Sequence, residues 1–372
     1  MTPSMNPPQL VRRPAPDPAK SNLLMFNLAV DADDPVLSFT TDWLNRLAAH
    51  FARIDVITMR TGRLAVAPNV HVYSVGKEKG YSEARRAVEF YRLLFRLTGT
   101  TRYFACFAHM MPLFAALGGP LLTARGIPIT LWFTHRQKSI PLQAAAAFSH
   151  RIVTAAPDSF PFSTPKLRVL GHGVDTEFFA PAPDSPPQAD FTVVHVARVM
   201  PIKHQDTLIR AAAAVPTMRV MLVGEVPPDT SEQYKTDLHA LADRMGVTDR
   251  VVFAGSQSKE GVRAILRSAS AAVNLSPPGL FDKAALEGMA VEVPTIASSE
   301  AFRPVMGRHA PALLIAAPED HNTLALRLAA IQRLPAEERR EMGARLRANV
   351  IAQHSLDGLI ERLVRVLIDG EP

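Results

Sequence analysis

Thr192-Val193-Val194-His195-Val196-Ala197-Arg198-Val199-Met200-Pro201-Ile202-Lys203 is a nearly continuous apolar run that ends at a proline and a lysine. A run rich in β-branched residues, without alternating polar positions, is typical of a strand buried on both faces of a parallel sheet. Proline is tolerated in the first turn of a helix. The segment therefore predicts a strand over residues 192–199 that leads directly into a helix.

Further runs of this kind follow in the second half of the chain, at residues 219–224, 250–255, 271–275, 293–297 and 312–316. Amphipathic patterns typical of helices lie between them, for example at residues 231–245 and 260–268. Strands that alternate with helices are joined by right-handed crossovers, which build a doubly wound parallel sheet.

The first half repeats this alternation less regularly. Strands are predicted at residues 23–30, 53–59, 104–109, 129–134 and 151–155, and helices at residues 39–51, 82–98 and 111–124. The sequence Pro181-Ala182-Pro183-Asp184-Ser185-Pro186-Pro187 separates the halves as a linker. The predicted fold class is α/β, with two Rossmann-like doubly wound domains that face each other across a cleft.

The expected domains are a disordered proline-rich arm over residues 1–19, an N-terminal domain over 20–171 and a C-terminal domain over 172–354. Residues 356–368 form an amphipathic helix, and whether the tail 355–372 packs back on the first domain is left open. Ligands of such sheets bind outside the carboxyl ends of the strands, so the cleft between the domains is the expected site.

Composition and charge exclude several protein classes. The 372 residues are 47% hydrophobic and 20% charged, which is ordinary for a globular chain of about two domains. The single cysteine, Cys106, excludes a disulfide framework and a cysteine-rich metal site, and it fits a reducing compartment. Residues 1–171 carry a net charge of +10 and residues 172–372 a net charge of −4, which suggests that the domains have different partners.

Two segments bear on localisation. The N-terminal 20 residues lack the apolar core of a signal peptide. Residues 103–124 are apolar enough to suggest a membrane span, but Pro112 and Gly118-Gly119-Pro120 favour a buried strand followed by a buried helix. We expect a cytoplasmic protein, with peripheral attachment to the inner membrane face left open.

Arg198 and Lys203 suggest an anion site. Arg198 falls at the carboxyl end of the predicted strand, and Lys203 in the first turn of the next helix, where a cation opposes the positive end of the helix dipole. A bound phosphate would reverse that penalty. The alternative is a solvated lysine beside an arginine that covers the sheet edge.

A second polar cluster follows the strand at 271–275, in Ser276-Pro277-Pro278-Gly279-Leu280-Phe281-Asp282-Lys283-Ala284-Ala285-Leu286-Glu287-Gly288-Met289-Ala290. Asp282 stands where a helix N-cap is expected. Glu287 lies in an otherwise apolar helix, where a carboxylate either faces a cleft or is stranded at considerable cost. Vicinal ribose hydroxyls are a suitable partner for it.

These residues resemble the retaining, nucleotide-sugar-dependent glycosyltransferases of the GT-B fold, in the large fourth family, glycosyl transferases group 1. Four segments match in order, and the match covers residues 165–300 well and the first half loosely. The segments are His172-Gly173-Val174-Asp175-Thr176-Glu177-Phe178-Phe179-Ala180-Pro181, the pair Arg198 and Lys203, Val252-Phe253-Ala254-Gly255, and Leu286-Glu287-Gly288-Met289-Ala290 with Val293-Pro294-Thr295-Ile296-Ala297-Ser298.

The resemblance implies roles for matched positions. Arg198 and Lys203 would bind the donor diphosphate, and Glu287 the ribose hydroxyls. Ser256 and Gln257 would lie by the nucleobase, while the backbone amides of residues 281–283, from Phe281 to Lys283, would face the phosphate and sugar. In the first domain, Leu131-Trp132-Phe133-Thr134-His135 resembles the strand whose terminal histidine lies beside the transferred sugar, so His135 is the expected catalytic residue. A structural role for this histidine is the alternative.

Two positions depart from the family pattern. The family usually has a glutamate that contacts the donor sugar eight positions before the one matched by Glu287, and this chain has Gly279 there. Asp282 or Lys283 would supply the missing contact. The family's glycine-rich loop after the first strand is replaced by Asp31-Ala32-Asp33-Asp34-Pro35-Val36-Leu37-Ser38-Phe39.

We interpret this acidic loop, with Asp33 and Asp34, as a lining of the acceptor side of the cleft. Asp31-x-Asp33 also fits the metal-binding triplet of the other, GT-A, glycosyltransferase fold, but such a triplet is common by chance and we expect no metal. His109 ends a predicted strand on the same side. It is either an acceptor contact or a hydrogen-bonded, partly buried histidine.

A basic stretch over residues 77–102 carries seven lysines and arginines together with an apolar side. It is either a domain helix with a solvated face or a surface helix that lies against an anionic membrane. No interleaved basic and aromatic motif for nucleic acid is present, so no nucleic-acid partner is expected.

The predicted function is transfer of a sugar from a nucleotide-diphosphate donor, such as a UDP- or GDP-sugar, to an acceptor hydroxyl, with retention and without a metal or resident cofactor. The expected context is glycan, polysaccharide or glycolipid biosynthesis. The acceptor is unknown, and a lipid-linked acceptor is left open. The alternatives are a non-catalytic nucleotide-sugar-binding protein and a GT-B nucleotide-sugar epimerase. A dinucleotide-dependent oxidoreductase is disfavoured because no Gly-x-Gly-x-x-Gly follows a predicted first strand.

Overall fold

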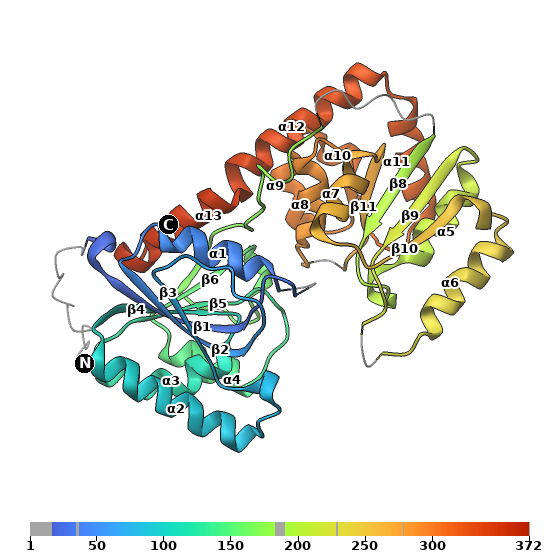
Figure 1. The fold of residues 1–372 in the computed structure, drawn as a ribbon. Coiled ribbons are helices and arrows are strands. Elements are labelled where there is room, and N and C mark those ends of the chain that lie inside the picture. The colour runs from blue at the N-terminus through green and yellow to red at the C-terminus, as the bar shows by residue number, and fades with distance from the viewer. Residues whose placement is uncertain (1–16, 35–36, 183–189, 228–229, 278, 372) are drawn as a thin grey trace, which may run out of the picture.

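The computed structural model describes residues 17–34, 37–182, 190–227, 230–277 and 279–371. The predicted arm and the predicted linker lie largely outside these residues. Two parallel sheets, each flanked by helices, form two domains (Figure 1). The predicted fold class, two Rossmann-like doubly wound domains, is confirmed.

The N-terminal sheet has the strand order β3-β2-β1-β4-β5-β6-β7. Its strands are β1 (Asn22–Val30), β2 (Arg53–Thr61), β3 (Val70–Ser74), β4 (Tyr103–His109), β5 (Ile129–Trp132), β6 (Arg151–Thr154) and β7 (Leu167–Val169). Its helices are α1 (Phe39–Ala48), α2 (Glu83–Thr100), α3 (Pro112–Ala124) and α4 (Ile140–Phe148), with short 3-10 turns η1 (Pro18–Lys20), η2 (Lys77–Lys79) and η3 (Pro157–Ser159).

Burial on both faces explains the continuous apolar strands. On β1, Leu23 and Met25 belong to the core that packs against α1, whereas Leu24 and Phe26 belong to the core that packs against α2 and α3. All four side chains are completely buried. Because successive side chains of a strand point to opposite faces, a strand covered on both sides must be apolar at every position.

The C-terminal sheet has the order β10-β9-β8-β11-β12. Its strands are β8 (Phe191–Val196), β9 (Met218–Val223), β10 (Val251–Gly255), β11 (Ala271–Asn274) and β12 (Thr295–Ala297). The helices are α5 (Gln205–Ala214), α6 (Gln233–Arg244), α7 (Lys259–Arg267), α8 (Lys283–Ala290), α9 (Arg303–Met306), α10 (Ala310–Leu313), α11 (His321–Arg333), α12 (Ala336–His354) and α13 (Leu356–Asp369), with the short turns η4 (Pro201–Lys203), η5 (Thr248–Arg250), η6 (Glu300–Phe302) and η7 (Gly307–His309).

Some predicted elements differ from the structure. The strand predicted at residues 312–316 is wrong, because α10 occupies its first half and only Leu314 forms an isolated bridge, to Ala297. The sequence did not predict β3 and β7, which lie at the two edges of their sheet and are only partly buried. Residues 103–124 form β4 and α3, as predicted, and no helix among the described residues is long and apolar enough to cross a membrane.

Two segments cross between the domains side by side. Val174 accepts a hydrogen bond from the Leu356 N–H and donates one to the His354 carbonyl, which pairs the first crossing with the turn between α12 and α13. Helix α13 then packs on the N-terminal domain beside α1 (Figure 1). Arg46 of α1 contacts both Asp175 and Asp357 there. The chain end is therefore attached to the first domain.

Candidate functional site

The loops after β8 and β11 leave neighbouring strands at their carboxyl ends, and they carry the predicted anion-binding residues. Arg198 lies two residues beyond β8, and its exposed side chain makes no hydrogen bond or ion pair with any described residue. Lys203 ends the turn η4 instead of lying in the first turn of α5, because His204 in between adopts a left-handed conformation with φ of 50°. Both cations therefore stand at the carboxyl edge of the sheet.

Lys203 is already engaged by the protein. Its Nζ lies 2.6 Å from Asp282 Oδ2 and donates a hydrogen bond to Ser276 Oγ over 2.9 Å. Asp282 also accepts hydrogen bonds from Ser276 Oγ and from Asn274 Nδ2. Burial would raise the pKa of Asp282, but Lys203 and these hydrogen bonds hold it below its usual value.

The interpretation of Asp282 as a helix cap is therefore corrected. Asp282 occupies the N-cap position of α8, yet its side chain makes no capping hydrogen bond, because it is turned toward Lys203. The backbone N–H groups of residues 281–283 make no hydrogen bond with another described residue. The start of α8 consequently keeps free donors beside the Lys203 amine.

A buried histidine lies beneath this cluster. His195, on β8, is 1% exposed, and neither of its ring nitrogens has a hydrogen-bond partner among the described residues. Burial and the nearby Lys203 charge lower its pKa to about 3, so the ring is neutral at pH 7. Because the His195 ring is uncharged, Lys203 carries the positive charge of the cluster that it forms with Asp282, Ser276 and Asn274.

Glu287 faces the same edge from the second turn of α8. It is half-buried and makes no hydrogen bond or ion pair with a described residue. Burial raises its pKa, and the charges of Lys283 and Lys259 act against that rise. A carboxylate with unused acceptor capacity close to two amines is suited to binding hydroxyl groups.

Lys283 connects the two domains at this place. Its Nζ lies 4.3 Å from the centre of the Phe39 ring at the start of α1. Beside it, Lys259 at the start of α7 pairs with Asp42 of α1 over 2.9 Å. Lys283, which was predicted to contact the donor, thus also contacts the other domain.

Phe281 supports the loop and does not present its ring to the site. The ring is 8% exposed and packs against His172, Phe302 and His354, while its carbonyl oxygen lies 2.6 Å from His172 Nε2. Any ligand contact of Phe281 would involve its backbone N–H, as the resemblance implies.

His135 follows β5 and faces this cluster from the N-terminal domain. The ring keeps solvent contact and packs edge-on against Phe133, with ring centres 5.9 Å apart. The surrounding protein and the Arg198 charge lower the pKa of His135, and Asp282 acts weakly in the opposite direction. The charge of Arg198, on the C-terminal domain, thus acts on the ring of His135, on the N-terminal domain.

Gly279 lies against the residue after His135. Its φ is +83°, and a Cβ atom there would lie 2.5 Å from Nη1 of Arg136 and 3.3 Å from its Cζ. The Arg136 side chain thus occupies the space into which a side chain at position 279 would project. This contact was not predicted from the sequence.

Ser256 and Gln257 follow β10, the edge strand of the C-terminal sheet, and both are exposed. The Gln257 amide donates to the Ala254 carbonyl over 2.6 Å. No contact joins these two residues to the Lys203 cluster, so their assignment to a nucleobase stays a prediction.

The acidic loop is held by arginines of the neighbouring strand and the loop after it. Arg63 binds both carboxylate oxygens of the exposed Asp33, and Arg60 lies 2.5 Å from the buried Asp34. Hydrogen bonding to Arg63 lowers the pKa of Asp33. The described residues include no group of three or more acidic, histidine or cysteine side chains placed to hold a metal ion.

The assignment of His109 to the acceptor side is corrected. The side chain is 2% exposed, its Nδ1 lies 3.3 Å from Asn27 Oδ1, and its ring packs against Trp43. Burial lowers its pKa to about 3. His109 is therefore the hydrogen-bonded, buried histidine of the second interpretation.

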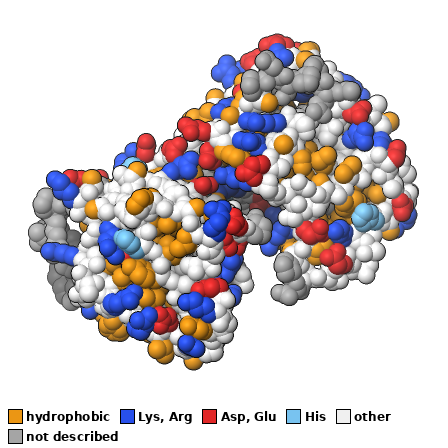
Figure 2. Space-filling view, in the orientation of Figure 1, with side chains coloured by type: hydrophobic (Ala, Val, Ile, Leu, Met, Phe, Trp, Pro, Cys, Tyr) orange, Lys and Arg blue, Asp and Glu red, His pale blue; other side chains and the backbone are white. Residues whose placement is uncertain are grey.

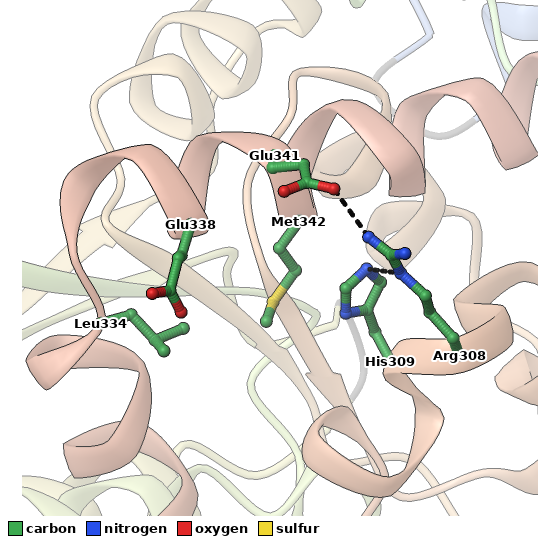
Figure 3. A pocket seen from close by; sticks show the side chains of 6 residues that line it. All are labelled: Arg308, His309, Leu334, Glu338, Glu341 and Met342. Carbon is green, nitrogen blue, oxygen red and sulfur yellow. Dashed lines mark hydrogen bonds and ion pairs between the residues drawn. The ribbon is translucent and has the colours of Figure 1, made fainter.

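The surface is hollowed between the two domains (Figure 2). A separate hollow of about 440 Å³ lies on the C-terminal domain between η7 and α12 (Figure 3). Its lining contains none of the predicted site residues, and its charged groups are partly paired, with Arg308 2.7 Å from Glu341. We assign no function to it.

Sequence reasoning missed three residues of the site: Asn274, Ser276 and Arg136. The first two are buried polar residues at the end of the apolar strand β11, and a buried polar group generally has a partner. Polar residues at the end of an apolar strand were therefore the sequence signal that could have identified Asn274 and Ser276. Arg136 gave no signal apart from its position next to His135.

Comparison with known proteins supports the family resemblance. Residues 190–333 match the family model described as glycosyl transferases group 1. A D-inositol 3-phosphate glycosyltransferase of Mycobacterium sp. (strain JLS) is 31% identical over 150 residues, which are 38% of this chain and 34% of the relative. The protein of the same name from Mycobacterium avium (strain 104) is 27% identical over 212 residues, 54% of this chain and 50% of the relative. The chain thus spans between a third and a half of the length of these curated relatives.

Two solved structures share the fold over nearly the whole chain. Anabaena HepE in complex with UDP and glucose has a TM-score of 0.73 at 15% identity, covering 93% of this chain and 99% of that one. Sucrose-phosphate synthase from Thermosynechococcus elongatus has a TM-score of 0.71 at 18% identity, covering 93% and 98%. These likenesses extend the two-domain GT-B architecture to the N-terminal half.

Proposed function

We propose that this chain, whose C-terminal domain matches glycosyl transferases group 1, transfers a sugar from a nucleotide-diphosphate donor to an acceptor hydroxyl. The observation that carries the proposal is the convergence of Arg198, Lys203 and the start of α8 at the carboxyl ends of β8 and β11. An exposed guanidinium, a buried amine and free backbone donors together match the oxygens of a diphosphate.

The diphosphate is the leaving group of this reaction, and it gains negative charge as the glycosidic bond breaks. Arg198 and Lys203 would stabilise that charge, because fixed cations in a site of low water content are far more effective than in bulk water. Fixed cations also make a metal ion unnecessary for this task. We therefore propose a metal-independent transfer.

Glu287 would bind the ribose of the donor. Its carboxylate has unused acceptor capacity and lies on α8, the helix whose start faces the diphosphate site. Two vicinal hydroxyls can donate to one carboxylate. The exposed Ser256 and Gln257 would then lie toward the base.

His135 would contact the transferred sugar from the N-terminal domain. The charge of Arg198, the residue proposed to bind the diphosphate, acts on the ring and supports this role. We propose retention of configuration by same-face attack of the acceptor, assisted by the departing phosphate, through an oxocarbenium-like centre. Closure of the two domains would expel water and limit hydrolysis of the donor.

The site suggests the class of donor, a nucleotide-diphosphate sugar, and the comparisons suggest which donors and acceptors to test. UDP- and GDP-sugars are both compatible donors, and HepE is a neighbour whose structure holds UDP and glucose. The named relatives act, by their names, on inositol 3-phosphate, which makes a phosphorylated polyol a reasonable acceptor to test beside lipid-linked and glycan acceptors.

Peripheral contact with an anionic membrane is part of the same proposal. Val88 and Phe95 on α2 are 69% and 53% exposed, and the same helix carries several arginines. Hydrophobic and basic side chains lie side by side on the surface of the N-terminal domain (Figure 2). Apolar side chains flanked by cations suit the boundary of an anionic bilayer. Sedimentation with phosphatidylglycerol vesicles tests this contact, and recovery of the protein only in the supernatant would exclude it.

A panel of nucleotides and nucleotide sugars in a thermal-shift assay, followed by product detection with and without acceptors, tests the main proposal. We expect stabilisation by nucleoside diphosphates and an acceptor-dependent product. Turnover without an acceptor would indicate the epimerase, and binding without turnover the non-catalytic binding protein. Stabilisation by NAD and not by nucleoside diphosphates would contradict the whole proposal.

A further inference from the structure

We propose that Arg136 binds a carboxylate on the donor sugar, so that the transferred group is a uronic acid. This inference rests on the proposed function, since it requires a nucleotide-diphosphate donor in the cleft. It begins from the contact between Arg136 and Gly279, which joins the loop after β5 to the loop between β11 and α8.

The contact depends on glycine in two ways. The φ of +83° lies in the left-handed region that residues with a Cβ rarely adopt. In addition, a Cβ at this position would lie within 3.5 Å of three atoms of the Arg136 side chain. Glycine therefore makes room for the guanidinium to approach the backbone of the donor-site loop.

This loop also holds the diphosphate site. Ser276 and Asp282, on either side of Gly279 in the sequence, both contact the Lys203 amine. A group bound at Gly279 is thus a close neighbour of the diphosphate, and the sugar is the part of the donor attached to that diphosphate. Arg136 is therefore placed to contact the sugar.

The charges around this place are positive where the sugar would lie. Arg136 follows His135 in the chain, and Arg198 lies close enough to His135 to lower its pKa. The carboxylate of Asp282 is engaged by Lys203, Ser276 and Asn274. The Arg136 side chain lies against Gly279, and the Arg198 charge acts on the neighbouring His135 ring.

A guanidinium recognises a carboxylate through two parallel hydrogen bonds, a geometry that neutral hydroxyls do not match. A glutamate at position 279, which the family resemblance leads one to expect, would instead repel a sugar carboxylate. Replacement of an expected acid by glycine and an apposed arginine reverses the local charge. The chemistry of the site thereby favours an acidic sugar over its neutral counterpart.

The test compares matched pairs of donors by isothermal titration calorimetry: UDP-glucose with UDP-glucuronate, and GDP-mannose with GDP-mannuronate. For the base that the protein accepts, we expect the acidic sugar to bind about tenfold more tightly than the neutral one, the scale of a charged hydrogen bond. Arg136→Gln should abolish this preference and leave the affinity for the nucleoside diphosphate alone within about twofold. Arg136→Lys should restore part of it.

Lys138→Gln is the matched control, because Lys138 lies in the same loop but faces the Phe162 ring at 5.9 Å. It should leave the preference unchanged. Equal binding of both sugars by the wild-type protein would overturn the inference, as would an equal loss of nucleoside-diphosphate binding in Arg136→Gln. So would an Arg136-dependent affinity for inositol phosphate measured with UDP bound, which would place the anion on the acceptor.

A different result, the absence of any nucleoside-diphosphate binding, would contradict the proposed function itself. A protein that binds UDP or GDP tightly, without preference for an acidic sugar, would retain the proposed function and lose only this inference.

Discussion

Lys203 Nζ lies 2.6 Å from Asp282 Oδ2, so a carboxylate of the protein occupies one side of the amine that is proposed to hold the donor diphosphate. The aspartate is bound there by three side chains and stays ionised, since its pKa lies below the usual value. A phosphate entering the site must either share Lys203 with Asp282 or displace it. The pair therefore sets part of the affinity for the donor.

Replacing Asp282 by asparagine tests this competition. The amide keeps the size of the side chain and removes the negative charge next to the incoming phosphate. We expect Asp282→Asn to bind UDP or GDP about fivefold more tightly, which is about 1 kcal/mol and the scale of a partly solvated charge interaction. Calorimetric titration measures it. Weaker binding would mean that Asp282 orients Lys203 for the diphosphate and does not compete with it.

The role proposed for Glu287 has its own signature. If its carboxylate binds ribose hydroxyls, Glu287→Gln should weaken nucleoside-diphosphate binding by about 1.5 kcal/mol and leave pyrophosphate binding unchanged. Pyrophosphate lacks the ribose, so it serves as the internal control. An equal loss for both ligands would show that the substitution perturbs the anion site, for instance through Lys283.

His135 should act on the reaction more than on binding. We expect His135→Asn to lower the turnover number about 100-fold, the lower range for a positioned polar group in a transition state, with donor affinity within about threefold. His50→Asn, two residues after the end of α1 in the same domain, is the control. A His135 variant with normal turnover would leave the histidine a structural residue.

The free energy of unfolding should already fall at pH values well above those at which carboxylates titrate. Burial lowers the pKa of four histidines, His109, His195 and His354 to about 3 and His172 to about 4. In the unfolded chain they titrate near 6.5, so between pH 6.5 and 4 the unfolded state binds more protons and stability falls as the pH falls.

Each buried histidine contributes about 1.4 kcal/mol per pH unit to this loss. Urea unfolding at pH 7.5, 6.0 and 5.0 measures the slope of the free energy of unfolding against pH. His109→Gln should reduce this slope by the contribution of one titrating histidine, about 1.4 kcal/mol per pH unit. A free energy of unfolding that does not change between pH 7.5 and 5.0 would contradict the burial of these rings.

Much of the fold could be predicted because its signals are local. The apolar runs that became β1, β8 and β11 are continuous, and both faces of β1 are covered by helices. Edge strands such as β3 need no such run, since one side of an edge strand faces solvent or a loop. The run at residues 312–316 was misinterpreted because a short buried helix and a buried strand have the same apolar composition.

The sequence could predict the positions of only those site residues that closely follow the end of a strand. Arg198 lies two residues after β8 and His135 three residues after β5, so each stands at the carboxyl edge of its own sheet. The pairing of Lys203 with Asp282 and the contact of Arg136 with Gly279 depend on loop conformation and on the relative placement of two domains, which no local pattern encodes. His109 shows the reverse error, since the end of a strand can also be buried under a helix.

The most direct test of the account is the affinity for UDP and GDP of Arg198→Gln and Lys203→Met, measured by calorimetry beside Arg219→Gln, an exposed arginine paired with Asp190 on the same domain. Each site variant should lose roughly 1.5–3 kcal/mol of binding free energy, the range for hydrogen bonds to charged groups, and the control should lose none. Undiminished binding in both site variants would show that the diphosphate is held elsewhere, and with it the proposed sugar transfer at this site would fall.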